Sequence, residues 1–174
     1  MSKRVFLGVP VEPNLASEIE KWMRKKFRAP NVRFISANNM HLTLVAPWYE
    51  DDIDSVIAKL KGSYFKKFTI KLDNVSFGPD PKHPRLIWSS GEAPIIMLDL
   101  KQSLEVRLDK RPEKRQYLLH LTIARFNQQS FINFKVKDID EKVGWKFEVD
   151  SFCLYESKLK PTGAEYSVLS TFSC

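Results

Sequence analysis

The same short motif, His-Leu-Thr inside an apolar run, occurs once in each half of this chain, at residues 41–43 and 120–122. Successive side chains of a β-strand point to opposite faces, so each motif places its histidine and threonine on one face and its leucine on the other. The chain has only 3 histidines, and two of them hold these equivalent positions. We therefore expect one site that is built from two imidazoles and two hydroxyls.

The remaining pattern predicts strands and helices that repeat loosely between the two halves. Apolar and alternating runs predict strands at residues 4–10, 32–35, 40–46, 68–77, 85–88, 117–126, 145–155 and 165–172. Helical spacing predicts helices at residues 13–27, 53–60 and 94–108. We expect Ala29-Pro30 to end the first helix and Pro47 to end the first motif strand.

This element order predicts an α+β fold in a single domain that spans residues 1–174. We expect two pseudo-symmetric lobes of mainly antiparallel sheet, with the helices on the outside. Both His-x-Thr motifs then line a central cleft between the lobes.

Composition favours an anionic partner. The formal net charge is +7 and the sequence pI is near 9.4, and nucleic acid is the commonest partner of such a chain. The alternative is that the excess lysines and arginines are solvated helix faces. No apolar run reaches the roughly 20 residues of a membrane-spanning helix, and the N-terminal apolar stretch is too short for a secretory signal. We expect a cytoplasmic monomer without a membrane partner, in which Cys153 and Cys174 are free thiols.

Two histidines in one site support acid–base chemistry. The ordinary pKa of an imidazole lies near 6.5, so one ring can accept a proton while the other donates one at the same pH. The hydroxyls of Thr43 and Thr122 can hold the oxygens of a phosphate between the rings. Arg125 can add a charge-assisted contact, but strict alternation places it on the face opposite to His120. A bulge or a long reach must bring Arg125 into the site.

Other uses of the motifs are less well supported. A histidine metal site usually adds a third His, a Cys or a carboxylate, and no Asp or Glu stands within two residues of either motif. We therefore expect no metal ion and no cofactor. Neither cysteine is near a motif, which disfavours nucleophilic catalysis. His83 is expected to be an exposed loop residue, and the basic run at residues 109–115 is either solvated surface or a contact for a phosphate backbone.

The paired motifs resemble those of the two-histidine phosphoesterase superfamily, and most closely the LigT-type RNA 2′,3′-cyclic phosphodiesterases, also called 2′-5′ RNA ligases. The resemblance extends over nearly the whole chain, from residues 4–6 through both motifs and residues 85–88 to residues 154–157 and Tyr166. It departs from the family pattern at residues 45–49, where Phe-Leu-Gly is usual, and at Leu119, where proline is usual.

The resemblance implies metal-independent hydrolysis of an RNA terminal 2′,3′-cyclic phosphate to a 2′-phosphate, with reversible 2′-5′ RNA ligation as a second reaction that the same site allows. It implies His41 and His120 as the acid and base, with His120 favoured as the base. Thr43, Thr122 and Arg125 would hold the phosphate. Phe6 matches an aromatic residue near the family's site and is either a base-stacking or a core residue.

The expected partner is an RNA 3′ end or an oligonucleotide that carries a cyclic phosphate. Two alternatives stay open at the level of sequence. The first is a 2′-5′ oligoadenylate or nucleotide cyclic phosphodiesterase of the same superfamily, and the second is a non-catalytic RNA-binding module.

Overall fold

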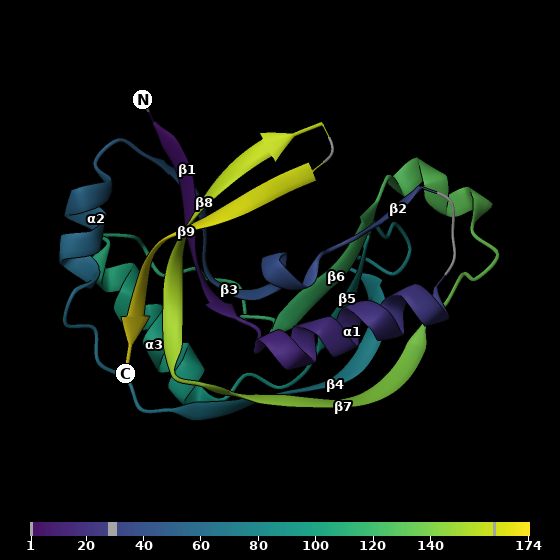
Figure 1. Ribbon diagram of the computed structural model, residues 1–174, viewed down its shortest axis with the longest axis horizontal. Helices are drawn as coiled ribbons and strands as arrows, with labels where there is room; N and C mark the ends of the chain where they lie inside the picture. The colour runs from purple at the N-terminus through teal and green to yellow at the C-terminus, as the bar shows by residue number, and fades with distance from the viewer. Residues whose placement is uncertain (1, 28–30, 162) are drawn as a thin grey trace.

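Nine strands, all paired antiparallel, form one sheet in the computed structural model, which describes residues 2–27, 31–161 and 163–174 (Figure 1). The strands are β1 (Lys3–Pro10), β2 (Val32–Phe34), β3 (His41–Glu50), β4 (Phe68–Gly78), β5 (Leu86–Ser90), β6 (His120–Phe126), β7 (Asp140–Val149), β8 (Ser151–Lys160) and β9 (Gly163–Ser173). Their order is β7-β4-β5-β6-β3-β1-β8-β9, and β2 pairs with β6 beside this path. The predicted α+β fold of mainly antiparallel sheet is confirmed.

In the part of the chain that the structure describes, three α-helices flank the sheet, namely α1 (Pro13–Lys26), α2 (Ile53–Leu60) and α3 (Ile95–Arg107), with short 3₁₀ helices η1 (Ala37–Asn39) and η2 (Gln128–Asn133). The Glu12 carboxylate caps α1 by accepting hydrogen bonds from the backbone N–H groups of Asn14 and Leu15. Asp52 caps α2 in the same way, accepting from the N–H of Ser55 at 2.9 Å. Within the described residues, no helix is long and apolar enough to cross a membrane.

The sheet divides into two lobes at the junction of β3 and β6. These two strands pair through a single residue pair, Leu42 with Leu121, which are the central residues of the two motifs. Beyond that pair, β3 continues into a first lobe with β1, β8 and β9, and β6 continues into a second lobe with β5, β4, β7 and β2. Leu42 and Leu121 are both 0% exposed, so the junction lies in the core.

Helices α1 and α3 each pack on the lobe that does not contain the strand before them. Helix α1 follows β1 of the first lobe but packs against β2 and β6 of the second, whereas α3 follows β5 of the second lobe and packs against β3 of the first. Figure 1 accordingly shows α1 on the side of β5 and β6, with α3 beside α2 at the other end of the molecule. One continuous hydrophobic cluster, which includes Leu15 and Met23 of α1 and Met97 of α3, spans both lobes.

Several boundaries differ from the sequence-based prediction, among them the start of β6, which is His120 rather than residue 117. Pro47 does not end the first motif strand, because it lies at an irregularity of the β1–β3 pairing, where its missing N–H breaks no ladder bond. The strand predicted at residues 145–155 is two strands, β7 and β8, separated at Asp150. The helix break predicted at Ala29-Pro30 lies outside the described residues. Cys153 and Cys174 are free, as predicted.

Candidate active site

The junction of β3 and β6 brings the two motifs onto one face of the sheet. Pairing of Leu42 with Leu121 in antiparallel strands sets His41 beside Thr122 and Thr43 beside His120, so the two histidines form a diagonal pair. Residues in that relation lie about 7–8 Å apart in a regular antiparallel pair, within reach of long or aromatic side chains. The gap between the two rings therefore suits one small group held between them.

Both imidazoles are oriented by the same backbone contact. Nδ1 of His41 lies 2.8 Å from the carbonyl oxygen of Asn39, and Nδ1 of His120 lies 2.9 Å from that of Leu118. Since a carbonyl can only accept, each Nδ1 carries the proton and donates it, which leaves each neutral ring with a basic Nε2. The geometry therefore prepares two proton acceptors, and either becomes a donor once it is protonated.

A bulge in β6 turns Arg125 toward the motif face. Trp88 of β5 is opposite Thr122 while Ile87 is opposite Ala124, so Ile123 is an extra residue on β6. Ile123 and Ala124 are both 0% exposed, and the next outward-facing residue is Arg125. The bulge is the departure from strict alternation that the sequence analysis required for Arg125 to reach the site.

The first motif has the same bulge without the arginine. Gly8 of β1 is opposite Thr43 while Leu7 is opposite Val45, which leaves Leu44 as the extra residue of β3. The residue that corresponds to Arg125 is then Ala46, which is exposed. The site thus has pseudo-symmetric histidines and threonines but a single guanidinium.

These side chains line one small cavity of about 60 Å³, which we call the histidine pocket. Its lining comprises Ile35, Asn39, His41, Thr43, His120, Thr122, Arg125 and Tyr166. Pockets for drug-sized ligands span about 300–1,000 Å³, so this cavity suits a group such as a phosphate rather than a whole nucleotide. The structure brings together both histidines, both threonines and Arg125.

Burial and positive neighbours lower the pKa of both imidazoles. For His41, loss of hydration lowers the pKa from 6.5 to about 4, against the hydrogen bond to Asn39, with Arg125 and His120 adding repulsion. Loss of hydration also lowers the pKa of His120, and Arg125 contributes in the same direction. Both rings are therefore neutral near pH 7 until an anion enters the pocket.

The ring of Phe6 packs against the ring of His41. Its ring centroid lies 4.7 Å from that of His41, it stacks on Tyr155 at 4.9 Å, and the edge of Tyr166 lies 5.1 Å away. Phe6 is 1% exposed, so its ring has no open face in this structure. Its burial supports the core interpretation rather than base stacking.

A protein-family model matches most of this chain. Residues 11–161 match the family model described as the 2′-5′ RNA ligase superfamily. This chain belongs to that superfamily. The resemblance predicted from the paired motifs is confirmed.

Relatives of the superfamily match this chain from end to end. The RNA 2′,3′-cyclic phosphodiesterase of Archaeoglobus fulgidus is 25% identical and that of Methanothermobacter thermautotrophicus 27% identical, with 97% and 99% of this chain covered and 99% of each relative. Escherichia coli LigT complexed with 3′-AMP has a TM-score of 0.79 at 21% identity, with 99% of this chain and 98% of LigT covered. TT0787 of Thermus thermophilus has a TM-score of 0.76 at 21% identity, with coverage of 98% and 97%. These structures share the fold.

Several residues around this superfamily site, Ile35 among them, were not predicted from the sequence as site residues. Asn39 and Tyr166 line the histidine pocket, and the ring of Trp88 lies 4.8 Å from that of His120. Tyr166 comes from β9, at the far end of the chain, so only the pairing of β8 with β1 brings it near. Both Trp88 and Tyr166 had a signal, because residues 85–88 and Tyr166 were part of the family resemblance.

The other residues considered from the sequence lie outside the histidine pocket. His83 is exposed in its loop, where Nδ1 lies 3.1 Å from a carboxylate oxygen of Asp80. The basic run at residues 109–115 is largely exposed, and Lys110 packs over the ring of Trp48 at 4.1 Å. Among residues 2–27, 31–161 and 163–174 no three His, Cys, Asp or Glu side chains are grouped to hold a metal ion.

Proposed function

We propose that this protein hydrolyses the terminal 2′,3′-cyclic phosphate of RNA to a 2′-phosphate, without a metal ion. The observation that carries the proposal is the diagonal pair of imidazoles across one phosphate-sized pocket, with a threonine beside each ring and Arg125 at the rim. The names of the curated relatives support the same substrate, since four of them are called RNA 2′,3′-cyclic phosphodiesterase.

Phosphate binding comes first in this mechanism. The hydroxyls of Thr43 and Thr122 donate hydrogen bonds to the non-bridging oxygens, and the Arg125 guanidinium neutralises their charge. An anion between the two rings also reverses the effect that lowers their pKa values, because it favours the charged imidazolium. Substrate binding therefore allows one of the two neutral rings to take up the proton that catalysis needs.

The two histidines then act on opposite sides of the phosphorus. One neutral Nε2 accepts a proton from water as the water oxygen attacks phosphorus. The other ring, protonated, gives its proton to the 3′ oxygen as the bond between phosphorus and that oxygen breaks. We propose His120 as the base and His41 as the acid, since His120 also borders a second, larger cavity of about 560 Å³ through which water can reach it. Attack on phosphorus by the 5′ hydroxyl of a second RNA in place of water, with the same transfer of a proton to the leaving 3′ oxygen, gives a 2′-5′ phosphodiester, and this ligation is reversible.

The first prediction is that His41→Ala and His120→Ala each lower kcat by roughly 10²–10⁴-fold, the usual contribution of one general acid or base. Hydrolysis of a nucleoside 2′,3′-cyclic phosphate by product chromatography measures the rates, and circular dichroism checks the fold. His83→Ala is the matched control, because His83 lies in an exposed loop, and it should keep wild-type activity, as should wild type in EDTA. Full activity in either motif variant would exclude the paired-histidine mechanism, whereas a wild type without turnover would favour a non-catalytic RNA-binding module.

A further inference from the structure

Three arginines surround another cavity, different from the two described above, that opens next to the histidine pocket. This cavity, which we call the arginine pocket, has a volume of about 490 Å³ and is lined by Asn31, Arg33, Arg85, Arg125, Phe126 and Asn127. These described lining residues include no carboxylate. Arg125 lines both cavities, so a ligand that fills the histidine pocket extends naturally past Arg125 into the arginine pocket.

The backbone holds these arginines close together. Arg33 of β2 is directly opposite Arg125 of β6 in the strand register, and Arg125 is opposite Leu86 of β5, the neighbour of Arg85. Arg85 is itself fixed by two backbone bonds: its N–H donates to the carbonyl of Gly78 and its carbonyl accepts from the N–H of Phe126. All three side chains are exposed.

Such an arrangement costs stability unless an anion compensates it. Like charges directly opposite each other on paired strands are destabilising. Within the described part of the chain, Arg85 and Arg125 have no carboxylate within ion-pair distance, so no protein group offsets them. Guanidinium groups recognise phosphate oxygens through paired, charge-assisted hydrogen bonds.

We propose that the arginine pocket binds the phosphodiester immediately upstream of the terminal cyclic phosphate, so that the enzyme prefers RNA ends to cyclic mononucleotides. This inference rests on the proposed function and names the substrate class for it. In an RNA strand the ribose that carries the cyclic phosphate is joined through its 5′ oxygen to the next phosphate. With the cyclic phosphate in the histidine pocket, Arg125 lies between the two phosphates, and Arg33 and Arg85 face the upstream one.

The test compares kcat/KM for two substrates that differ by one phosphodiester, a nucleoside 2′,3′-cyclic phosphate and a dinucleotide that ends in the same cyclic phosphate. Wild type should prefer the dinucleotide by roughly 10- to 100-fold, the range that one charged hydrogen-bonded contact provides. Added salt should reduce the preference. A dinucleotide with an uncharged methylphosphonate linkage should behave like the mononucleotide. Equal kcat/KM for all three substrates would overturn the inference.

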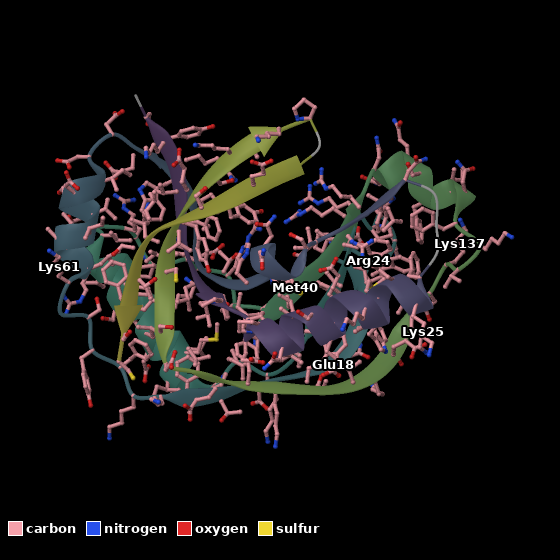
Figure 2. All side chains as sticks on the ribbon, viewed as in Figure 1. Glu18, Arg24, Lys25, Met40, Lys61 and Lys137 are labelled. Atoms are coloured by element: carbon pink, nitrogen blue, oxygen red, sulfur yellow. The ribbon has the colours of Figure 1, made fainter. Side chains whose placement is uncertain are left out.

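Arg85→Gln isolates the arginine pocket, because Arg85 lines it without lining the histidine pocket. The variant should lose most of the dinucleotide preference through a higher KM, with mononucleotide kinetics unchanged. Arg33→Gln is a second variant for the same expectation, and thermal unfolding confirms that each variant folds. Lys61→Gln removes the same charge at the C-terminal end of α2 and should leave the preference intact, because α2 lies at the end of the molecule opposite to β2, which carries Arg33 (Figure 1 and Figure 2). Equal losses of Arg85→Gln on both substrates would contradict the inference.

A binding measurement distinguishes failure of the proposed function from failure of the phosphate site. If wild type hydrolyses none of these substrates, fluorescence anisotropy with a labelled dinucleotide 3′-phosphate and a labelled nucleoside 3′-phosphate still tests the pocket. Tighter binding of the dinucleotide that is lost in Arg85→Gln supports the phosphate site without catalysis. Equal affinities for the two ligands would contradict the proposed phosphate site and would point to a different anionic partner.

Discussion

At the scale of single residues, the burial of His41 affects both the free energy of unfolding and the pKa of its ring. The ring lies against Phe6 and Tyr166, at centroid distances of 4.7 and 4.9 Å, and donates its Nδ1 proton to a carbonyl. This packing orients the ring and also removes water from it. An imidazole held in this way presents an oriented Nε2, but its charged form is costly at this buried position.

The pKa of His41 therefore predicts a loss of stability in mild acid. The pKa is 6.5 in the unfolded chain and about 4 in the folded protein, so below pH 6.5 the unfolded state binds a proton that the folded state does not. The stabilisation is fully present above pH 6.5 and is lost as the pH falls toward 4, by roughly 3 kcal/mol at 1.36 kcal/mol per pKa unit. Urea unfolding between these pH values measures the change.

His41→Gln should flatten this part of the stability profile relative to wild type, since glutamine does not titrate. His83→Gln, in an exposed loop, should leave the profile unchanged. Inorganic phosphate should restore part of the wild-type stability in acid, because an anion in the histidine pocket favours the protonated ring. A His41→Gln profile as steep as that of wild type would assign the acid sensitivity to other groups.

At the scale of elements, the positions of β4 and β5 determine where His120 lies. The Trp88 ring lies 4.8 Å from His120 and donates its Nε1 proton to Ser76 Oγ at 3.0 Å. The same ring covers Gly78, so a Cβ added to Gly78 would overlap the ring carbons of Trp88. The strand needs a glycine there because the indole occupies the space of a side chain.

Gly78→Ala should therefore displace the Trp88 ring and disturb His120. We expect a loss of about 1–3 kcal/mol in the free energy of unfolding, the usual cost of overpacking, together with a lower kcat. Gly144→Ala in β7 is the control, because nothing lies within 4 Å of its added Cβ, and its effect should stay within about 0.5 kcal/mol. Thermal unfolding and cyclic phosphate hydrolysis give the two readouts. Wild-type values for Gly78→Ala would show that the ring moves without consequence.

The elements also show what can be predicted from the sequence. The alternation of His41 with Thr43 and of His120 with Thr122 identified both motif strands and the face that they share. The position of Arg125 was not predictable, because a bulge depends on pairing with β5, which the sequence of β6 does not encode by itself. The break at Asp150 was missed for a similar reason: the alternation of β7 leads directly into the consecutive buried residues 152–155 of β8, and only their pairing with different partners separates the two strands.

At the scale of the whole molecule, the packing of α1 and α3 across the lobes makes the folding of each lobe depend on the other. Helix α1 follows β1 of the first lobe and packs on the second, and α3 follows β5 of the second lobe and packs on the first. The phenol of Tyr117 also donates a hydrogen bond to the carbonyl of Thr43 at 2.7 Å. The core is one cluster that spans both lobes. The lobes resemble each other, but neither has a complete core of its own.

We accordingly predict that residues 1–174 unfold as a single cooperative unit. The chain has 4 tryptophans, of which Trp48 lies on β3 in the first lobe and Trp145 on β7 in the second. Variants that keep one of these two, with phenylalanine at the other tryptophan positions, report on each lobe by fluorescence. In each variant the fluorescence transition in urea should coincide with the loss of far-ultraviolet circular dichroism. A fluorescence midpoint that departs from circular dichroism would indicate lobes that unfold separately.

The contrast between Ala46 and Arg125 has a consequence for the direction of the reaction. Two equivalent histidine and threonine pairs, taken alone, would accept a five-membered cyclic phosphate in either of two orientations related by the pseudo-twofold axis. A guanidinium on one side and a methyl group on the other make those orientations unequal in energy. Under the proposed mechanism only one of the two ester oxygens then faces the protonated imidazole, so a nearly symmetric site releases a single regioisomer.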